Sequence, residues 1–255
     1  MFSNQLRSVL NEQAIAYARK HRLKVEARKT AVLFPEVEGM ITNFNASSFN
    51  NIRKNGDWLA RTQKPHSQVR GAKELQSSNS SDALLMSIFC YPRITACKGL
   101  TSLLNIAPNT RPVFGWNPEF SNEDPKYPTE VDMKIGNNIF EAKLTESDFT
   151  DKEQDIVLGY EQFGDTFETS LLKIQNGKYK NYQLTRNFLA AKKYDFHFTL
   201  LVDMRRPDLI REFLDTVKAV KDPALTSRLN FITWQEITEV VPAALKGWLK
   251  EKYGF

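Results

Sequence analysis

The sequence has few of the residues on which several common protein chemistries depend. Of 255 residues, two are cysteine and three are histidine. Cys90 and Cys97 belong to no CxxC or Cys/His cluster, which argues against a disulfide scaffold and against structural zinc. We expect both cysteines to be small buried side chains near a helix. His21, His66 and His197 form no HExxH pattern, so a metalloprotease site is also excluded.

Long apolar runs and glycine-rich phosphate loops are missing as well. No apolar run approaches the about 18 residues of a membrane-spanning helix, and the opening MFSNQLRSVLNEQ has no apolar signal-peptide centre. Neither a GxxxxGK[ST] nor a GxGxxG loop occurs. The hydrophobic content of 41% and the charged content of 25% are ordinary for a globular domain. We expect a cytoplasmic protein without membrane contact.

Positive charge is concentrated at the start of the chain. Residues 1–73 contain 13 Lys/Arg and five Asp/Glu, whereas the remaining residues contain 22 and 25. Cations and aromatic residues alternate in this segment: Arg53, Lys54, Arg61 and Lys64 with Phe44, Phe49 and Trp58. The interleaving suits nucleic-acid contact through phosphates and bases. It suits a small hydrophobic cluster beneath a solvated basic loop equally well.

The stretch 129–146, TEVDMKIGNNIFEAKLTE, is the most informative part of the chain. Two segments of alternating polar and apolar residues flank the Gly-Asn pair at 136–137, which favours a two-residue β-hairpin turn. The pairs expected across this hairpin are Asp132 with Glu141 and Glu130 with Lys143. The four polar side chains then share one face, and the apolar residues form the other.

Two carboxylates that face each other across a β-ladder lie about 5 Å apart and repel each other. A divalent cation between them removes the repulsion, and Mg²⁺ is often held by one or two carboxylates together with substrate phosphate. A neighbouring lysine can hold a scissile phosphate or the attacking water. Asp132, Glu141 and Lys143 therefore make a minimal metal-dependent phosphodiesterase site. An exposed polar strand face with a Glu–Lys pair is the alternative that the spacing leaves open.

The pattern D-x8-E-A-K on a hairpin resembles the core motif of the PD-(D/E)XK nuclease superfamily, and EAKLTESDF is similar to one uncharacterised bacterial branch. SSDALLMSIF, residues 80–89, resembles the leading helix of that branch. Residues 181–193 and 196–210 resemble the helix and strand after its hairpin. The similarity covers roughly residues 40–235. The proline of the superfamily name is displaced, since Pro128 lies four residues before the aspartate.

The resemblance implies an α/β fold of the restriction-endonuclease-like kind, with a mixed central β-sheet flanked by helices. We treat residues 1–255 as one nuclease-like domain, which consists of a basic helical and loop extension over residues 1–75 and a nuclease core over residues 76–255. Helices are expected near residues 3–21, 82–91, 93–105, 182–193, 207–221 and 235–252, and strands near 30–34, 111–120, both halves of the hairpin, 196–202 and 229–234.

The function that the resemblance implies is Mg²⁺- or Mn²⁺-dependent hydrolysis of DNA. The metal ligands would be Asp132, Glu141 and the carbonyl of Ala142, joined by a further carboxylate from Glu119 or Glu130. Glu119 is preferred because it ends the first strand, beside the expected hairpin. The acidic stretch from Thr145 to Phe167 is expected to be solvated near the rim of the site.

Lys143 would stabilise charge or position water, and the helix after the hairpin adds two groups. In the resembling branch, Gln183 would orient water and Arg186 would bind phosphate; an exposed helix face explains their spacing equally well. DNA is the expected partner, while RNA and a homodimer stay open. The rival hypotheses are a catalytically inactive nucleic-acid-binding protein with the nuclease fold, and an RNA-processing or small-molecule enzyme with a similar sheet.

Overall fold

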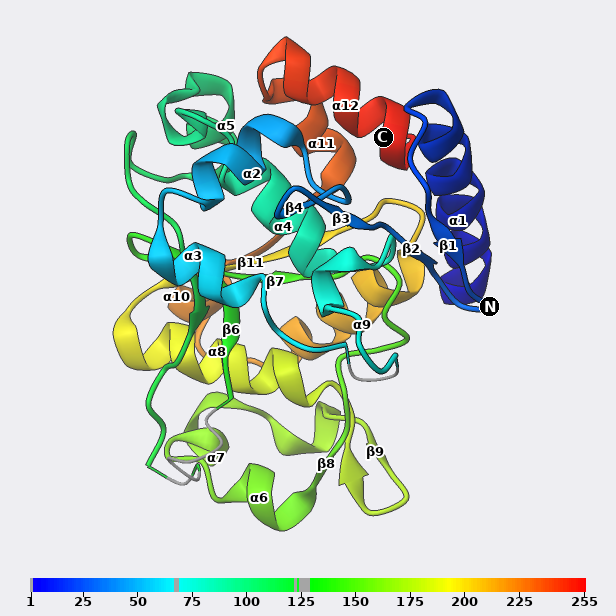
Figure 1. The fold of residues 1–255 in the computed structure, drawn as a ribbon. Helices are drawn as coiled ribbons and strands as arrows, with labels where there is room; N and C mark the ends of the chain where they lie inside the picture. Colours follow the sequence, from blue (N-terminus) through cyan, green and yellow to red (C-terminus); the bar gives the residue numbers. More distant parts are fainter. Residues whose placement is uncertain (1, 67–68, 122, 124–128) are drawn as a thin grey trace. The chain divides into compact units, whose positions relative to one another are not determined.

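The first and last helices of the chain pack side by side (Figure 1). In α1 (Phe2–Lys20) the buried residues Leu6, Leu10, Ala14 and Ala18 recur at a spacing of four, which places them on one stripe of the helix. α12 (Ala243–Tyr253) packs against α1. The two ends of the sequence therefore belong to one folded unit.

The computed structural model describes residues 2–66, 69–121, 123 and 129–255. The chain divides into two compact units: unit 1 comprises residues 1–112 and 233–255, and unit 2 comprises residues 113–232. The expected division between the extension and the nuclease core, at residues 75 and 76, lies inside unit 1. No helix among the described residues is long and apolar enough to cross a membrane.

Unit 1 is mainly helical. Besides α1 and α12 it contains α2 (Ala46–Ile52), α3 (Gly56–Arg61), η1 (Glu74–Gln76), α4 (Ser81–Phe89), η2 (Ile94–Ala96), α5 (Lys98–Leu104), α11 (Trp234–Val240) and two short antiparallel ladders, β1 (Glu26–Ala27) with β2 (Val32–Leu33) and β3 (Glu36–Val37) with β4 (Met40–Ile41). The side chains of Asn45 and Asn55 cap α2 and α3 by accepting backbone N–H groups. Apart from its first residue, Ser81, α4 is buried all round, as its apolar sequence predicts.

Two of the aromatic residues considered for base stacking belong to the core instead. Phe44 and Phe49 are buried and pack edge to face, with ring centroids 5.3 Å apart. The hydrophobic-cluster interpretation is therefore correct for this pair. Trp58 is half-buried and carries the Arg111 guanidinium over its ring. Both cysteines are free, and Cys90 is buried as expected, whereas Cys97 is half-buried.

Unit 2 is built on a mixed sheet that has five strands within the described residues. Its strands, in spatial order, are β12 (Leu229–Thr233), β11 (His197–Val202), β7 (Asn138–Ala142), β6 (Val131–Ile135) and β5 (Val113–Trp116). β5, β6 and β7 are antiparallel, whereas β11 runs parallel to β7. The mixed central sheet is confirmed. Every residue of β7 is buried, because this strand lies between β6 and β11.

The hairpin has the predicted register. Met133 pairs with Phe140 and Ile135 with Asn138, so residues 136 and 137 form the turn. Gly136 has a φ of +56°, a left-handed conformation that glycine adopts without a steric penalty. Asp132 and Glu141 therefore follow directly on the paired part of the two strands.

The helices of unit 2 pack on the sheet through a large aromatic core. α8 (Tyr182–Tyr194) contributes Phe188, and α9 (Pro207–Lys218) contributes Phe213; both rings contact Phe198 of β11. The remaining elements are α6 (Gln154–Leu158), α7 (Phe163–Thr166), η3 (Thr169–Leu171), α10 (Pro223–Thr226) and a small sheet of β8 (Lys152–Glu153), β10 (Lys178–Tyr179) and β9 (Ile174–Gln175).

Candidate active site

Charged side chains gather in unit 2 where β6, β7 and α8 meet. Asp132 lies on β6, Glu141 lies on β7, and Lys143 follows the last residue of β7. The Oδ2 atom of Asp132 accepts the backbone N–H of Ala142 at 2.8 Å. The hairpin register and this hydrogen bond together hold the Asp132 carboxylate beside β7. The positions expected from the sequence are thus brought into one neighbourhood.

Glu141 is buried and both of its carboxylate oxygens are engaged. Its side chain is 2% exposed. Oε1 lies 3.0 Å from Nζ of Lys143, and Oε2 accepts a hydrogen bond from Nδ2 of Asn187 at 2.9 Å. Nζ of Lys143 also donates to Oε1 of Gln183 at 2.8 Å. Gln183 and Asn187 are one turn apart on α8, so a single helix turn supports both charged groups.

The electrostatic environment fixes the charge of Lys143. Burial by itself would lower its pKa, but the charges of Glu141, Glu146 and Asp132 and the hydrogen bond with Glu141 outweigh burial and raise the pKa to about 12. The side chain is therefore an ammonium at neutral pH. Lys143 can stabilise an anion, but it is poorly suited to accept a proton as a general base.

Glu146 is a site residue that the sequence pattern did not single out. Its Oε2 accepts the N–H of Leu144 at 2.6 Å, and its charge acts on Lys143. The fully buried guanidinium of Arg206 donates to the carbonyls of Leu144, Glu146 and Ser147, at 3.3, 2.6 and 3.4 Å. The only sequence signal for Glu146 was its position, because it follows Lys143 by three residues in the segment after β7.

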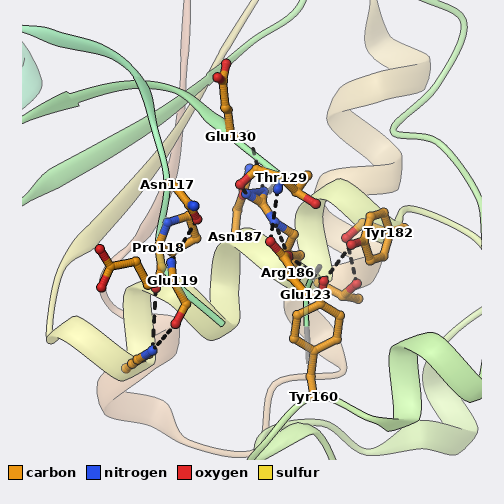
Figure 2. A network of polar contacts seen from close by, with 12 residues as sticks. Asn117, Pro118, Glu119, Glu123, Thr129, Glu130, Tyr160, Tyr182, Arg186 and Asn187 are labelled. Atoms are coloured by element: carbon orange, nitrogen blue, oxygen red, sulfur yellow. Dashed lines mark hydrogen bonds and ion pairs between the residues drawn. The ribbon is translucent and has the colours of Figure 1, made fainter. Parts of the chain in front are cut away.

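Arg186 is placed differently from the phosphate-binding group that the resemblance implied. Figure 2 shows its guanidinium between Glu123, the backbone of residues 129–130 and Asn187. Nε lies 3.2 Å from Oε1 of Glu123, Nη1 donates to Oδ1 of Asn187 at 2.7 Å, and Nη2 donates to the carbonyl of Thr129. The side chain is 1% exposed. A phosphate contact would require Arg186 to leave these partners.

Two tyrosines complete the Arg186 network. The Tyr160 hydroxyl donates to Oε1 of Glu123 at 2.6 Å and lies 2.6 Å from the Tyr182 hydroxyl (Figure 2). Burial, followed by the hydrogen bonds with Glu123 and Tyr182, raises the pKa of Tyr160, so it stays a neutral donor. Because Asn187 contacts both Arg186 and Glu141, the network reaches from Glu123 to the buried carboxylate of the site.

The two candidates for a further carboxylate ligand are exposed. The backbone carbonyl of Glu119 accepts Nζ of Lys193 at 2.8 Å. The backbone carbonyl of Glu130 accepts Nη1 of Arg186 at 3.4 Å. Figure 2 shows both carboxylates directed away from the Arg186 guanidinium. The carboxylates whose charges act on Lys143 are instead Glu141, Glu146 and Asp132. Pro128 lies outside the described residues.

The basic residues of the leading segment that were expected to contact nucleic acid lie in unit 1: Arg53, Lys54, Arg61 and Lys64. Arg61 pairs with Asp82 at 2.9 Å, and the two side chains are 12% and 11% exposed. Lys64 pairs with Glu74 at 3.2 Å, and Arg53 donates to the carbonyl of Glu38. Lys54 is exposed. Arg61 therefore neutralises a poorly solvated carboxylate, whereas the other three side chains are accessible.

The donor set can be tested against a divalent cation. Among residues 2–66, 69–121, 123 and 129–255 no group of three or more His, Cys, Asp and Glu side chains could hold a metal by itself. Asp132 and Glu141 nevertheless fit a hard cation that takes one or two protein carboxylates and completes its shell with substrate and water. Three carboxylates around one ammonium also leave surplus negative charge, which such a cation would balance.

A mixed sheet with acidic residues on adjacent strands and a lysine after the second strand defines a restriction-endonuclease-like α/β protein. The family model described as Restriction Endonuclease associating with ARP matches residues 11–254, and the chain belongs to this family. No curated protein matches the chain, and no solved structure matches it either.

Proposed function

We propose that the protein is a metal-dependent nuclease of the PD-(D/E)XK type that hydrolyses DNA phosphodiester bonds. The observation that carries the proposal is the gathering of Asp132, Glu141, Lys143 and Gln183 where β6, β7 and α8 meet. A purely structural Glu–Lys pair would explain the contact between Glu141 and Lys143. It would not explain why two further carboxylates surround the same ammonium.

Asp132, Glu141 and the carbonyl of Ala142 would hold Mg²⁺ or Mn²⁺. A divalent ion at a phosphodiester lowers the pKa of bound water and neutralises charge on phosphate oxygens. The protein's part is to present the carboxylates in a fixed arrangement. Asn187 holds one oxygen of Glu141, and the Ala142 N–H holds one oxygen of Asp132.

Lys143 and Gln183 act on the substrate side of the proposed site. The Lys143 ammonium keeps its proton and stabilises negative charge that develops on the phosphate during water attack. Gln183 holds Nζ of Lys143 through its amide oxygen, which orients the ammonium and the adjacent water. A mobile lysine would have to be ordered during the reaction, whereas this one is ordered beforehand.

The experiment combines calorimetric Mg²⁺ and Mn²⁺ titration with a plasmid-nicking assay. The wild type should bind metal and nick DNA, and Asp132→Asn and Glu141→Gln should lose both properties. Glu130→Gln is the matched control, since it removes one exposed carboxylate from the same hairpin and should leave both properties intact. Metal binding without cleavage of any DNA or RNA form would overturn the nuclease proposal. Nucleic-acid binding without metal binding would establish the inactive binding protein.

A further inference from the structure

Unit 1 contains a cavity of about 290 Å³ beside the β1–β2 ladder. Its lining includes three basic residues and one acidic residue from two separate stretches of the basic leading segment: Lys24, Glu26, Arg28 and Arg70. The cavity shares no residue with the carboxylate site, because all of its lining residues belong to unit 1 and the carboxylates belong to unit 2.

The charges around the cavity are not balanced. Arg28 pairs with Glu26 at 2.5 Å, and both side chains are exposed. Lys24 and Arg70 are exposed too, and neither has an ion-pair partner among the described residues. The lining therefore keeps an excess of two positive charges. Cations without partners that border one concavity attract an anion of matching charge.

Apolar surface lies next to the cations. Leu33 and Phe34 are buried beneath the cavity, and Pro35 and Val69 form half-buried walls. A volume of about 290 Å³ is close to the lower end of small-molecule pockets. The combination suits one nucleotide unit, with its phosphate at the cations and its sugar or base against the apolar walls.

We propose that this cavity binds the terminal phosphate of a nucleic-acid strand, together with the end nucleotide. A phosphate monoester carries between about −1.5 and −2 charges at neutral pH, which matches the excess of the lining, whereas a backbone diester carries one. An end nucleotide can enter a concavity, but the phosphates of a continuous duplex lie on a convex surface. The inference rests on the proposed function only in taking nucleic acid as the ligand.

The test uses the full chain with EDTA present, so that binding is measured without cleavage. Fluorescence anisotropy compares single-stranded oligonucleotides that end in a 5′-phosphate, a 3′-phosphate or hydroxyl groups, each labelled at the opposite end. A phosphorylated end should bind about tenfold more tightly, because charge-assisted hydrogen bonds to the phosphate are added. Its salt dependence should also be steeper, by about 0.7 in log–log slope for each phosphate contact on a single strand.

Two triple variants with the same charge change separate the cavity from the rest of the basic surface. Lys24→Gln, Arg28→Gln and Arg70→Gln should abolish the preference for phosphorylated ends. Arg19→Gln, Arg22→Gln and Lys29→Gln remove two arginines and one lysine at exposed positions outside the cavity, and should retain the preference. Arg70→Glu alone removes the excess positive charge of the lining and should abolish the preference as well. If both triple variants behave alike, the cavity has no role in end recognition.

Competition distinguishes the possible sources of the phosphate. Inorganic phosphate and a mononucleotide should compete weakly with a phosphorylated oligonucleotide. Tight binding of either one, without discrimination between oligonucleotide ends, would overturn the strand-end proposal in favour of a free small ligand. Discrimination in EDTA without any later cleavage would leave the cavity proposal standing and remove the nuclease proposal. Cleavage of DNA without discrimination between strand ends would support the nuclease proposal and overturn the cavity proposal.

Discussion

Lys143 is a buried ammonium whose main partner, Glu141, is buried with it. Removing one member of such a pair costs about 3–5 kcal/mol, because the remaining charge is left without compensation. We therefore expect Lys143→Met to be strongly destabilised in EDTA and to lose cleavage. Mg²⁺ should raise the melting temperature of Lys143→Met more than that of the wild type, since the cation replaces the missing charge. Equal Mg²⁺ shifts in both proteins would argue against a metal at Glu141.

Asn187 connects Glu141 with Arg186 and was not selected from the sequence as a site residue. Asn187→Leu should lower stability by about 1–3 kcal/mol, because a buried carboxylate oxygen loses its donor. Cleavage should fall through kcat, while KM stays close to the wild-type value, because Asn187 positions Glu141 and does not hold DNA. Steady-state kinetics give kcat and KM for Asn187→Leu and the wild type. A change in KM alone would contradict the positioning role.

Lys252 offers a pH test that is independent of the active site. It is buried in unit 1, where Nζ donates to the backbone carbonyl and to Oδ1 of Asn43 and lies over the Phe34 ring. Burial lowers the pKa of Lys252 well below its ordinary value. Between the folded and unfolded pKa values the unfolded chain binds more protons, so this group makes stability rise with pH and lowers it as pH falls.

The measurement is the free energy of unfolding from about pH 7 to about pH 10, the range below the ordinary lysine pKa. The wild type should gain stability with pH relative to Lys252→Met. Staying below pH 10 keeps Tyr17 and Tyr253 neutral, because burial raises the pKa of both hydroxyls. Parallel pH profiles for the two proteins would show that Lys252 keeps its ordinary protonation.

At the scale of elements, Arg206 joins the start of α9 to the segment that follows β7. Its guanidinium holds three carbonyls of residues 144–147 and pairs with Asp208. Arg206→Met should therefore release this segment, with faster amide hydrogen exchange at residues 144–147 and reduced cleavage. Arg211→Met, at an exposed position of α9, is the control and should leave exchange in that segment unchanged. Unaltered exchange in Arg206→Met would separate Arg206 from the site.

The elements that could be predicted from the sequence are those with a local signal. The Gly-Asn turn and the alternation around it define the hairpin register, and Pro207 marks the start of α9. The apolar run of β11 indicates a strand covered on both faces. Each of these features is encoded within a few residues, and the fold class follows from their order.

The parts that could not be predicted depend on distant partners. The spacing of Gln183 and Arg186 placed both on a polar helix face, but it could not show that Arg186 is buried against Glu123. The acidic run after β7 likewise hid Glu146, because its contact with the Leu144 N–H and its effect on Lys143 cannot be read from the spacing. Polar residues with buried partners look like surface residues in a sequence.

For the whole molecule, the basic segment should contribute to nucleic-acid binding through its accessible cations. Neutralising Arg53, Lys54 and Lys64 together should weaken DNA binding and flatten its salt dependence, by about 0.9 in log–log slope for each duplex phosphate contact that is lost. Cleavage at saturating DNA should survive. Arg61 is left unchanged, because its removal would leave the poorly solvated Asp82 carboxylate without its ion-pair partner. An unchanged salt slope would mean that these three cations only solvate the surface.

The pairing of α1 with α12 has a consequence for the order in which the protein is made. Unit 2 is one continuous stretch, whereas unit 1 needs residues 233–255 to join residues 1–112. Synthesis proceeds from the N-terminus, so every residue of the carboxylate site has been added before the last part of unit 1. The basic leading segment acquires its full set of partners only after residues 233–255 have been added. A ribosome-bound nascent chain would therefore contain all residues of the carboxylate site before it contains all residues of unit 1.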